Sequence, residues 1–372
     1  MRIGIDARMY GTKSTTGIGA YIKNLTDNLF LIDQKNEYIL FMKDPAYSEF
    51  NPPSKRIKKV KVDIPWYSFS EQIKLPKILL KHKLDLIHFP HFNVPIIYPK
   101  KFITTIHDIT PKFFPGPNVK KSLIRKIGYK LTFFCGINRS KKIITISNYT
   151  KDKLIKHFNL KPEKIKLTYL GFNNNFKPIR DQNVLDNINK KYNISKPFIF
   201  FVGVWRDHKN IPGLVTAFNI LKSEYKLDYQ LVLGGQTDER YPEIKQAIKN
   251  SPFEKDIITT GYISDDDLPA IYSNASLFAF PSFSEGFGIV ALEAMACGTP
   301  VVASNNTSLP EILQDAAIYF NPYNSKEIAE IIKKVITNPE IQSQLRDKGF
   351  NQIKKYNWQD TAKKTLAVYE TS

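Results

Sequence analysis

The chain has 372 residues, a length that favours two domains, and its 42% hydrophobic and 13% aromatic content allows packed cores and excludes a disordered protein. Only two cysteines occur, Cys135 and Cys297, which excludes a disulfide framework and a cysteine-rich metal site. The net charge of +19 lies in the first half, because residues 1–172 hold 32 Lys and Arg against 12 Asp and Glu, and the remaining residues hold 22 against 23.

The basic first half favours an anionic partner, such as nucleic acid, a membrane surface or an acidic substrate. It has no nucleic-acid-binding motif, so we expect lipid phosphate or an anionic membrane surface and no nucleic acid. Lysine outnumbers arginine 45 to 9, and lysine-rich coding is the alternative explanation. The amino terminus is too polar for a signal peptide, and no apolar run approaches the length of a membrane span. We expect a cytoplasmic protein, peripheral on the inner face of the cell membrane.

Short apolar runs alternate with helical patterns along both halves of the chain. In the first half they predict a helix around 21–31 and strands over 2–6, 38–42, 85–89, 102–106 and 142–146. In the second half they predict strands over 198–202, 230–233, 257–260 and 276–280. Strand–helix alternation is typical of doubly wound parallel sheets, so the predicted fold class is α/β with two such domains.

The polar stretch 173–196 contains Pro178, three consecutive asparagines and few apolar residues, which predicts an interdomain linker. It separates an amino-terminal domain over 1–172 from a carboxy-terminal domain over 197–355. Apolar residues at helical spacing predict a final helix within about 356–372. Ligands of parallel sheets collect beyond the carboxyl ends of the strands, so the cleft between the two sheets is the expected ligand site.

Two strand ends in the first half carry candidate binding residues. Gly17 and Gly19 lie in the first turn, where they would let the backbone approach a ligand, although the third glycine of a dinucleotide fingerprint is missing and an ordinary turn is the alternative. The segment Thr105-Ile-His-Asp-Ile-Thr-Pro111 leaves a buried strand. There His107 would contact the transferred group and Asp108 would orient a hydroxyl or ring nitrogen, with a structural His-Asp pair as the alternative.

The segment Gly203-Val-Trp-Arg-Asp-His-Lys-Asn210 lies between a strand and a helix in the second half. Arg206 could hold a diphosphate through its planar guanidinium and Lys209 through its point charge. A solvated basic turn is the alternative interpretation.

The segment Pro281–Pro300 leaves an apolar strand, turns through Gly286 and Gly288, and enters a helix that ends at Gly298. Free amides at the helix start suit a phosphate. Glu285 and Glu293 stand on either side with seven residues between them, and carboxylates would repel a phosphate. They suit sugar hydroxyls instead, so the segment predicts a nucleotide-sugar site, with an ordinary capped helix as the alternative.

The triplet Asp265-Asp-Asp267 could suggest a metal site. It follows Ser264 and precedes a helical pattern, and acidic residues favour the first turn of a helix. We interpret the triplet as a helix cap and predict no metal site. The basic stretch Lys120–Phe134 mixes cations with an apolar stripe, which predicts a helix packed on the core or a helix at a membrane interface. A second basic run covers 55–61.

The twenty-residue segment Pro281–Pro300 resembles the E-x7-E signature of retaining glycosyltransferases with two Rossmann-like domains facing a cleft, the GT-B architecture of sequence family four (glycosyl transferases group 1). Lys209-Asn210 is similar to the phosphate-binding loop of that family, although His208 stands where arginine is often found. Ile5-Asp-Ala-Arg8 with the Gly17–Gly19 loop and His107-Asp108 is similar to mannosyltransferase-like members.

This resemblance implies an acceptor-binding domain over 1–172, joined by the final helix, and a donor-binding domain over 197–355. It implies transfer of a hexose, with mannose from GDP-mannose as our first choice, to a glycan or lipid-linked acceptor in surface polysaccharide or glycoconjugate assembly. The implied catalytic residues are Glu285, His107, Lys209 and Arg206. The implied donor-binding residues are Gly17, Gly19, Gly203, Tyr262, Ile263, Gly286, Phe287, Gly288, Ile289 and Glu293.

Three alternatives remain at this point. The first is a UDP-sugar donor, because base choice depends on backbone contacts that side chains do not reveal. The second is a nucleotide-sugar epimerase, and the third is an inactive binding subunit of a glycan-assembly complex. For the glycosyltransferase we expect no metal and no cofactor, and the nucleotide sugar is its donor substrate.

Overall fold

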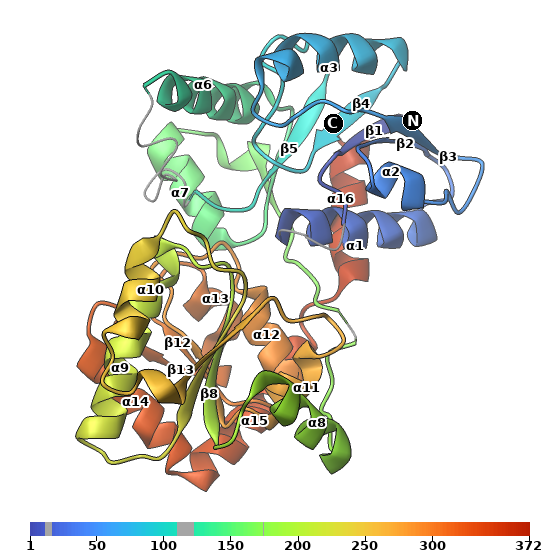
Figure 1. The fold of residues 1–372 in the computed structure, drawn as a ribbon. Coiled ribbons are helices and arrows are strands. Elements are labelled where there is room, and N and C mark those ends of the chain that lie inside the picture. The colour runs from blue at the N-terminus through green and yellow to red at the C-terminus, as the bar shows by residue number, and fades with distance from the viewer. Residues whose placement is uncertain (12–16, 110–122, 174) are drawn as a thin grey trace. The chain divides into compact units, whose positions relative to one another are not determined.

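The protein forms two compact units in the computed structural model, which describes residues 1–11, 17–109, 123–173 and 175–372 (Figure 1). Unit 1 contains Met1–Gly171 together with Asn357–Ser372, and unit 2 contains Phe172–Tyr356. The final segment of the chain therefore belongs to the first unit.

Unit 1 is built from strands that alternate with helices. Its strands are β1 (Arg2–Ala7), β2 (Glu37–Met42), β3 (Ile57–Lys61), β4 (Leu86–Phe89), β5 (Phe102–Ile106), β6 (Ile143–Thr145) and β7 (Ile165–Leu167). Its helices are α1 (Gly17–Ile32), α2 (Ala46–Glu49), α3 (Phe69–Lys81), α6 (Leu123–Arg139), α7 (Asn148–Phe158) and α16 (Trp358–Glu370).

Unit 2 repeats the same alternation. Its strands are β8 (Phe198–Val202), β9 (Gln230–Gly234), β10 (Ile257–Gly261), β11 (Leu277–Phe280), β12 (Val301–Ser304) and β13 (Ala317–Phe320). Its α-helices are α8 (Gln182–Tyr192), α9 (Ile211–Ser223), α10 (Pro242–Lys249), α11 (Leu268–Asn274), α12 (Ile289–Ala296), α13 (Leu309–Leu313), α14 (Ser325–Ile336) and α15 (Pro339–Ile353).

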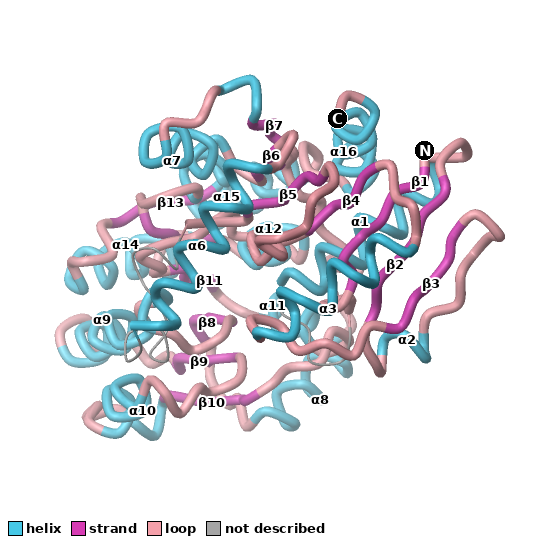
Figure 2. The backbone as a smooth tube through the Cα atoms, turned by 90° about the horizontal axis from the view of Figure 1, so that it is seen from above, coloured by secondary structure: helices cyan, strands magenta, loops and turns pink. Residues whose placement is uncertain are grey.

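Each unit contains one parallel sheet (Figure 2). The order is β3-β2-β1-β4-β5-β6-β7 in unit 1 and β10-β9-β8-β11-β12-β13 in unit 2. All the pairings are parallel. The strand order reverses between β1 and β4 in unit 1 and between β8 and β11 in unit 2. Open α/β sheets bind ligands beyond the carboxyl ends of the strands at such reversals, so each unit has one expected binding edge.

The helices of unit 1 cover both faces of its sheet. In Figure 1, α1 and α16 lie on one face, while α3 and α6 lie on the other. Buried residues Leu75 and Leu79 of α3 share a core cluster with Phe41, Phe89 and Cys135, the last of which comes from α6. On the opposite face, the Tyr369 hydroxyl of α16 lies 2.8 Å from His88 Nδ1, which fixes the last helix to β4.

The expected linker 173–196 is largely part of unit 2. It contains α8, which begins after Asp181, whose side chain accepts a hydrogen bond from the Asn183 amide, and ends at Asn193 in the left-handed conformation. Leu185 and Ile188 are buried, because their i, i+3 spacing presents one narrow apolar stripe to the core. The low apolar content that suggested a linker is therefore that of a surface helix.

Four strands have no counterpart among the strands predicted from the sequence: β3, β7, β12 and β13. β3 covers the run 57–61, where exposed lysines alternate with Ile57 and Val60 and made the segment resemble a basic run. β7, β12 and β13 have three or four residues each, too few for a clear apolar pattern. Within the part of the chain that the structure describes, no helix has the length and apolar content to cross a membrane.

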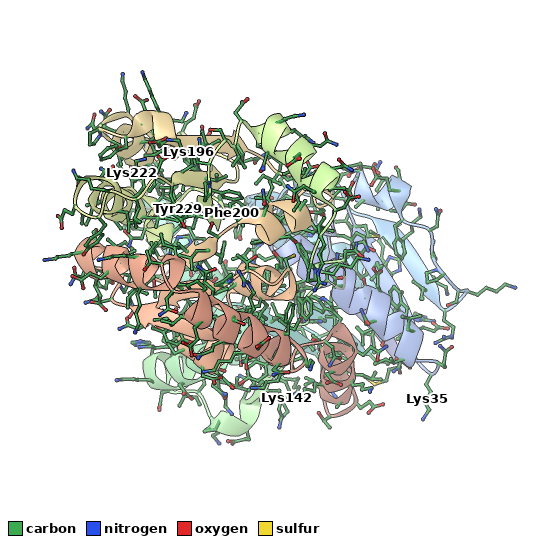
Figure 3. The ribbon with its side chains drawn as sticks, turned by 90° about the horizontal axis from the view of Figure 1, so that it is seen from below. Lys35, Lys142, Lys196, Phe200, Lys222 and Tyr229 are labelled. Carbon is green, nitrogen blue, oxygen red and sulfur yellow. The ribbon has the colours of Figure 1, made fainter. Side chains whose placement is uncertain are left out.

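Lysines of unit 2 are paired with aspartates at the amino ends of its strands. Lys196 Nζ lies 2.8 Å from Asp228 and 3.0 Å from Asp256, and Lys222 Nζ lies 3.1 Å and 2.8 Å from the same two residues. Figure 3 shows the two lysines close together beside Tyr229. This cluster lies at the end of the sheet opposite the expected binding edge.

Candidate functional site

The binding edge of unit 2 is formed by the loops that follow β8 and β11. The loop after β8 is 203–210 and contains Arg206 and Lys209, and the loop after β11 is 281–288 and contains Glu285. The two strands are neighbours in the sheet and run in parallel. The two motifs, about 75 residues apart in sequence, therefore leave the same edge side by side.

Hydrogen bonds hold these two loops together. The Phe283 amide donates to the His208 carbonyl at 2.7 Å. The Asn210 side chain donates to the carbonyls of Pro281, at 3.2 Å, and Pro322, at 2.7 Å. Asn210 has φ of +54°, a conformation that asparagine tolerates better than most residues, and its side chain is buried. The loop geometry is thus fixed before any ligand binds.

Lys209 and Glu285 form an ion pair at this edge. Lys209 Nζ lies 2.6 Å from Glu285 Oε1, and the two side chains are 16% and 12% exposed. The ammonium also lies 5.6 Å from the centre of the Phe280 ring. Backbone contacts hold the Glu285 main chain, because its amide donates to Thr307 Oγ1 and its carbonyl accepts from Ser308 Oγ, both at 3.0 Å. The pair is positioned from both sides and remains reachable from solvent.

The helix α12 begins directly beyond this ion pair. Gly288 precedes it with φ of +91°, a conformation suited to glycine, and a Cβ there would lie 2.6 Å from Leu309 and 3.2 Å from Phe280. The first amides of a helix have no acceptor within the helix. Together with Lys209, they provide hydrogen-bond donors and positive charge for an anionic group such as a phosphate.

Glu293 lies one turn into α12 and is partly buried. Burial is the largest effect on its carboxyl group and raises its pKa to about 7, and the charge of Asp265 raises it further while the Tyr272 hydroxyl opposes the shift. The Tyr272 hydroxyl donates to Glu293 Oε2 at 3.4 Å. Burial thus disfavours the ionised form of Glu293 in the absence of a ligand. Hydroxyl groups of a ligand could donate hydrogen bonds to this carboxylate.

Glycines bring three strand ends of unit 2 close together. The Gly203 amide donates to the Gly234 carbonyl at 3.2 Å, and the Gly235 amide donates to the Gly261 carbonyl at 2.8 Å. Gly235 has φ of +110°, and a Cβ there would lie 2.0 Å from the Gly203 carbonyl oxygen. Only glycine fits at position 235, a residue that the sequence analysis missed because a single glycine after a strand carries no motif.

The other predicted donor-site residues differ in how they are placed. Tyr262 is 55% exposed, and Ile263 beside it is buried with its Cδ1 against the Gly234 position. Arg206 is exposed. Phe287 is 3% exposed and its ring contacts Tyr356 of the core, so its backbone rather than its side chain faces the edge. Gly286 is buried and Ile289 is half-buried at the start of α12.

The triplet 265–267 leads into α11. Ser264 Oγ accepts a hydrogen bond from the Asp267 amide at 3.2 Å, whereas the Asp267 side chain, directly before the helix, makes no capping hydrogen bond. Asp267 Oδ2 accepts from Lys191 Nζ at 2.6 Å and from the Tyr192 hydroxyl at 2.7 Å. Among the described residues, no group of three or more His, Cys, Asp or Glu side chains could hold a metal ion.

His107 of unit 1 stands at the carboxyl end of β5. Burial lowers its pKa to about 4, and its Nε2 donates to the Pro90 carbonyl at 2.9 Å. The ring packs edge-on against Tyr21 with centroids 4.7 Å apart. At neutral pH the ring is therefore neutral and oriented, with Nδ1 as its hydrogen-bond acceptor.

The reversal between β1 and β4 in unit 1 carries a small pocket. Its lining mixes apolar, aromatic and polar side chains: Asp6, Arg8, Met9, Ile18, Ile22, Trp66, Phe89, Pro90, His91 and Asn93. Arg8 binds Asp6 through two nitrogens, at 2.8 Å and 2.7 Å, and Glu71 through one, at 2.5 Å. Asn93 Nδ2 reaches Glu71 at 2.8 Å. The sequence analysis missed Glu71 and Asn93, which are far from Arg8 in sequence.

Some predicted features fall on residues that the structure does not describe. The prediction that Gly17 and Gly19 lie in a turn is wrong, because both belong to the first turn of helix α1, where Gly19 is buried; Thr16 before them lies outside the described residues. The same holds for Thr110 and Pro111 of the His107 motif. Lys120 and Lys121 of the basic stretch also lie outside them, and the Arg125 side chain is not described.

Comparisons with known proteins agree with this geometry. The family Glycosyltransferase Family 4 matches residues 16–176, and the family Glycosyl transferases group 1 matches residues 185–352. The chain is 30% identical to O-antigen chain mannosyltransferase B of Escherichia coli over 299 residues, which cover 78% of this chain and 76% of that protein. It is 27% identical to the serotype-specific mannosyltransferase WbdA of Escherichia coli, covering 74% of this chain and about a third, 34%, of that longer protein.

Solved structures show the same fold. Anabaena Alr3699/HepE in complex with UDP-glucose matches 100% of this chain and 99% of its own, with a TM-score of 0.77 and 16% sequence identity. The two parallel α/β units are thus the two Rossmann-like domains of a GT-B glycosyltransferase. The chain belongs to the glycosyltransferases of family 4, the glycosyl transferases group 1. The family and fold class predicted from the sequence are confirmed.

Proposed function

We propose that this protein is a retaining hexosyltransferase that moves mannose from GDP-mannose to a glycan or lipid-linked acceptor in surface polysaccharide or glycoconjugate assembly. The observation that carries the proposal is the Lys209–Glu285 pair, 2.6 Å long, at the start of α12 and one helical turn from Glu293. This arrangement offers a cation and helix amides to a diphosphate and two carboxylates to sugar hydroxyls. The mannosyltransferase names of two relatives support mannose as the sugar.

Each residue of the unit 2 edge has a role in this proposal. Glu293 accepts the ribose hydroxyls, while Gly203, Tyr262 and Ile263 border the base. Lys209, Arg206 and the backbone of Gly286–Ile289 hold the diphosphate. Glu285 accepts hydroxyls of the transferred sugar.

The ion pair also suggests what changes when the donor binds. Without donor, Lys209 neutralises Glu285, whose side chain is only 12% exposed. The diphosphate would compete for the Lys209 ammonium and leave Glu285 oxygens available to sugar hydroxyls. As the bond to the sugar breaks, negative charge grows on the leaving phosphate. Fixed cations and amides then stabilise it without a metal ion or cofactor.

We assign no covalent nucleophile. The acceptor hydroxyl attacks on the face from which the diphosphate leaves, the leaving phosphate takes its proton, and the configuration of the sugar is retained. His107 contacts the transferred sugar through Nδ1. Gly17 and Gly19 allow close approach of the α1 start to the donor.

We assign the acceptor to unit 1, with the pocket at the β1–β4 reversal as its entry point. Trp66, 36% exposed, provides an apolar ring for one face of a sugar, and Asp6 and Asn93 provide hydrogen-bonding groups. A lipid-linked acceptor would place the enzyme at the inner face of the cell membrane, in the cytoplasm.

The donor is tested by thermal unfolding with GDP, GDP-mannose, UDP and UDP-glucose. A ligand at roughly 100 times its dissociation constant stabilises the fold by roughly 2.7 kcal/mol, so GDP-mannose is expected to raise the melting temperature by several degrees. A larger shift with UDP would favour a UDP-sugar donor, which the UDP-glucose complex of the HepE structure supports. The anomeric configuration of the product, measured by NMR, tests retention: an inverted product would contradict it.

A further inference from the structure

Exposed apolar side chains recur on one side of two helices of unit 1. On α3 these are Phe69, 81% exposed, Ile73, 40%, and Leu80, 41%; on α6 they are Leu123, 72%, Ile127, 48%, Leu131, 54%, and Phe134, 61%. The α3 residues follow the spacing i, i+4, i+11 and the α6 residues the spacing i, i+4, i+8, i+11, which places each set along one side of its helix. The opposite sides of the same helices supply Leu75, Leu79 and Phe133 to the core. Both helices are therefore apolar on the buried and on the exposed side.

The two exposed sides belong to one surface of unit 1. Ile96 lies between the helices: its amide donates to Gln72 of α3 at 2.7 Å, and its carbonyl lies 3.7 Å from Cys135 Sγ of α6. The next residue, Ile97, is 61% exposed. Figure 1 shows α3 and α6 on the same side of the unit 1 sheet. We call this surface, formed by the seven helix residues and Ile97, the α3–α6 face.

Positive charge surrounds these apolar side chains. Lys74, Lys77, Lys126 and Lys130 are exposed on the two helices, and none of them forms an ion pair with another described residue. Across α3, the segment 90–101 and α6, the sequence contains a single carboxylate, Glu71. Glu71 is fully buried and bound to Arg8. The α3–α6 face is therefore apolar, basic and without exposed acidic groups.

We propose that the α3–α6 face docks onto an anionic lipid bilayer, with Phe69, Ile97, Leu131 and Phe134 entering the headgroup boundary and the lysines contacting lipid phosphates. An apolar ridge flanked by lysines is the pattern of an interfacial helix. A second copy of this chain fits less well, because a two-fold interface would bring the lysines of this face against themselves. An acidic protein partner would satisfy the lysines but not so large an unbroken apolar ridge.

The location of the face deepens the proposed function, on which this step rests. Trp66 lines the unit 1 pocket and Phe69 follows it by three residues; His91 and Asn93 line the pocket and Ile97 follows them. The same two chain segments thus connect the pocket to the α3–α6 face. A bilayer at this face would bring a membrane-borne acceptor to the pocket.

Sedimentation of the protein with vesicles tests the docking surface. We expect binding to vesicles that contain phosphatidylglycerol, weak binding to pure phosphatidylcholine, and loss of most binding at high salt. The double variant Phe69→Asn/Leu131→Asn should bind at least about tenfold more weakly, because two exposed apolar side chains lose their lipid contact. Lys77→Gln/Lys130→Gln should weaken binding about tenfold or more and reduce its salt dependence.

Matched controls come from the other face of the same unit. Leu31, 71% exposed on α1, and the exposed Lys35 that Figure 3 labels lie away from α3 and α6. Leu31→Asn and Lys35→Gln should leave vesicle binding within about twofold of the parent. Equal loss in these controls, or unchanged binding in both double variants, would overturn the proposal.

Insertion is tested separately from electrostatic attraction. A tryptophan at Phe134→Trp should be quenched by vesicles with brominated acyl chains, and one at Leu31→Trp should not. Quenching at both positions or at neither would overturn the proposal. Analytical ultracentrifugation of the parent should show no self-association that Phe69→Asn/Leu131→Asn removes; such a dimer would make the face a self-interface and overturn lipid docking.

The test of the docking surface can be separated from the test of the proposed function. Vesicle binding is measured without nucleotide, and nucleotide binding is measured by thermal shift without vesicles. The α3–α6 variants should keep the same shift with GDP-mannose as the parent, because none of the substituted residues is among the proposed donor-binding residues. A failed nucleotide shift with intact vesicle binding would reject the donor and leave the docking surface standing.

Discussion

The two units share a topology, but the charged side chains at the strand reversal are buried in unit 1 and partly exposed in unit 2. In unit 1, Arg8 and Glu71 have side chains that are 1% and 0% exposed, and their hydrogen bonds are directed at each other, Asp6 and Asn93. In unit 2, Lys209 and Glu285 remain 16% and 12% exposed beside free helix amides. The first set holds a loop in place, whereas the second is held by its loops and faces solvent. We therefore propose that similar ion pairs at equivalent edges are structural in unit 1 and ligand-binding in unit 2.

The surfaces differ as well. Unit 1 carries 34 Lys and Arg against 14 Asp and Glu, a net of +20, while unit 2 carries 20 against 21, a net of −1. In unit 2, Lys196 and Lys222 pair with Asp228 and Asp256 at the amino ends of the strands. In unit 1, the lysines of α3 and α6 face solvent next to apolar side chains. Lysine-rich coding alone would not confine the excess to one unit.

The largest expected effect is on the stability of unit 1. Arg8→Met leaves two carboxylates in a site with little solvent, and removing one partner from a buried ionic network typically costs about 3–5 kcal/mol. Chemical denaturation should show this loss in the transition that includes unit 1. The matched control is Arg2→Met, whose partner Glu37 at 3.1 Å and whose own side chain are 43% and 39% exposed. It should cost less than about 1 kcal/mol. Equal losses would remove the distinction between the two kinds of pair.

The next largest effect is on turnover in unit 2. Lys209→Ala removes a cation whose interaction strengthens as charge develops on the leaving phosphate, so kcat for mannose transfer should fall on the order of 10²–10³-fold. Lys245→Ala, an exposed lysine on α10, is the control and should keep the parent rate. A normal kcat in Lys209→Ala would make the Lys209–Glu285 pair structural, like the Arg8 network.

Glu293→Ala should differ from Lys209→Ala in kind. In the proposed site Glu293 contacts a ribose hydroxyl equally in substrate and transition state, so its loss should raise the donor KM with a smaller change in kcat. The two variants are separated by initial rates at saturating and limiting GDP-mannose. If kcat falls alone in Glu293→Ala, the residue does not bind the ribose.

Part of the fold and part of the candidate site could be predicted from the sequence. Apolar runs predicted β1, β2, β4 and β5, because buried parallel strands are nearly continuous hydrophobic segments. The loops around Lys209 and Glu285 could also be predicted, since glycines and charges at strand ends carry a motif. The Arg8–Glu71 pair could not, because 63 residues separate the partners and only the fold brings α3 over the end of β1. For the same reason the sequence did not reveal Gly235, which must be glycine because the neighbouring strand end at Gly203 lies so close to it.

A fourth prediction concerns pH. Burial raises the pKa of Glu293 to about 7 from the usual 4.5. Below about pH 4.5 the carboxyl group is protonated in both the folded and the unfolded protein, so it does not change the free energy of unfolding. Between about pH 4.5 and pH 7 the unfolded chain has released the proton that the folded protein retains, so stability falls across this window and the full penalty is present above pH 7. Glu293→Gln should therefore stabilise the donor-free protein by on the order of 1–3 kcal/mol at pH 8 and by little near pH 4.5.

Thermal unfolding across this pH range measures the difference. Glu243→Gln, an exposed carboxylate at the start of α10, is the matched control and should show no such dependence. A gain for Glu293→Gln that is equal at pH 4.5 and pH 8 would contradict a raised pKa, and would mean that the carboxylate is not held at the expense of stability.

The smallest expected effect is that of a chelator. In the proposed chemistry the leaving diphosphate is neutralised by Lys209, Arg206 and the amides of α12. The Asp267 carboxylate already accepts hydrogen bonds from Lys191 and Tyr192. Mannose transfer should therefore keep its rate within about twofold in excess EDTA, with EDTA preloaded with Ca²⁺ as the control for ionic strength. Loss of turnover that Mg²⁺ or Mn²⁺ restores would show that unit 2 neutralises its diphosphate with a metal ion. In that case the Lys209–Glu285 pair would be exposed because the site still lacks its metal ion.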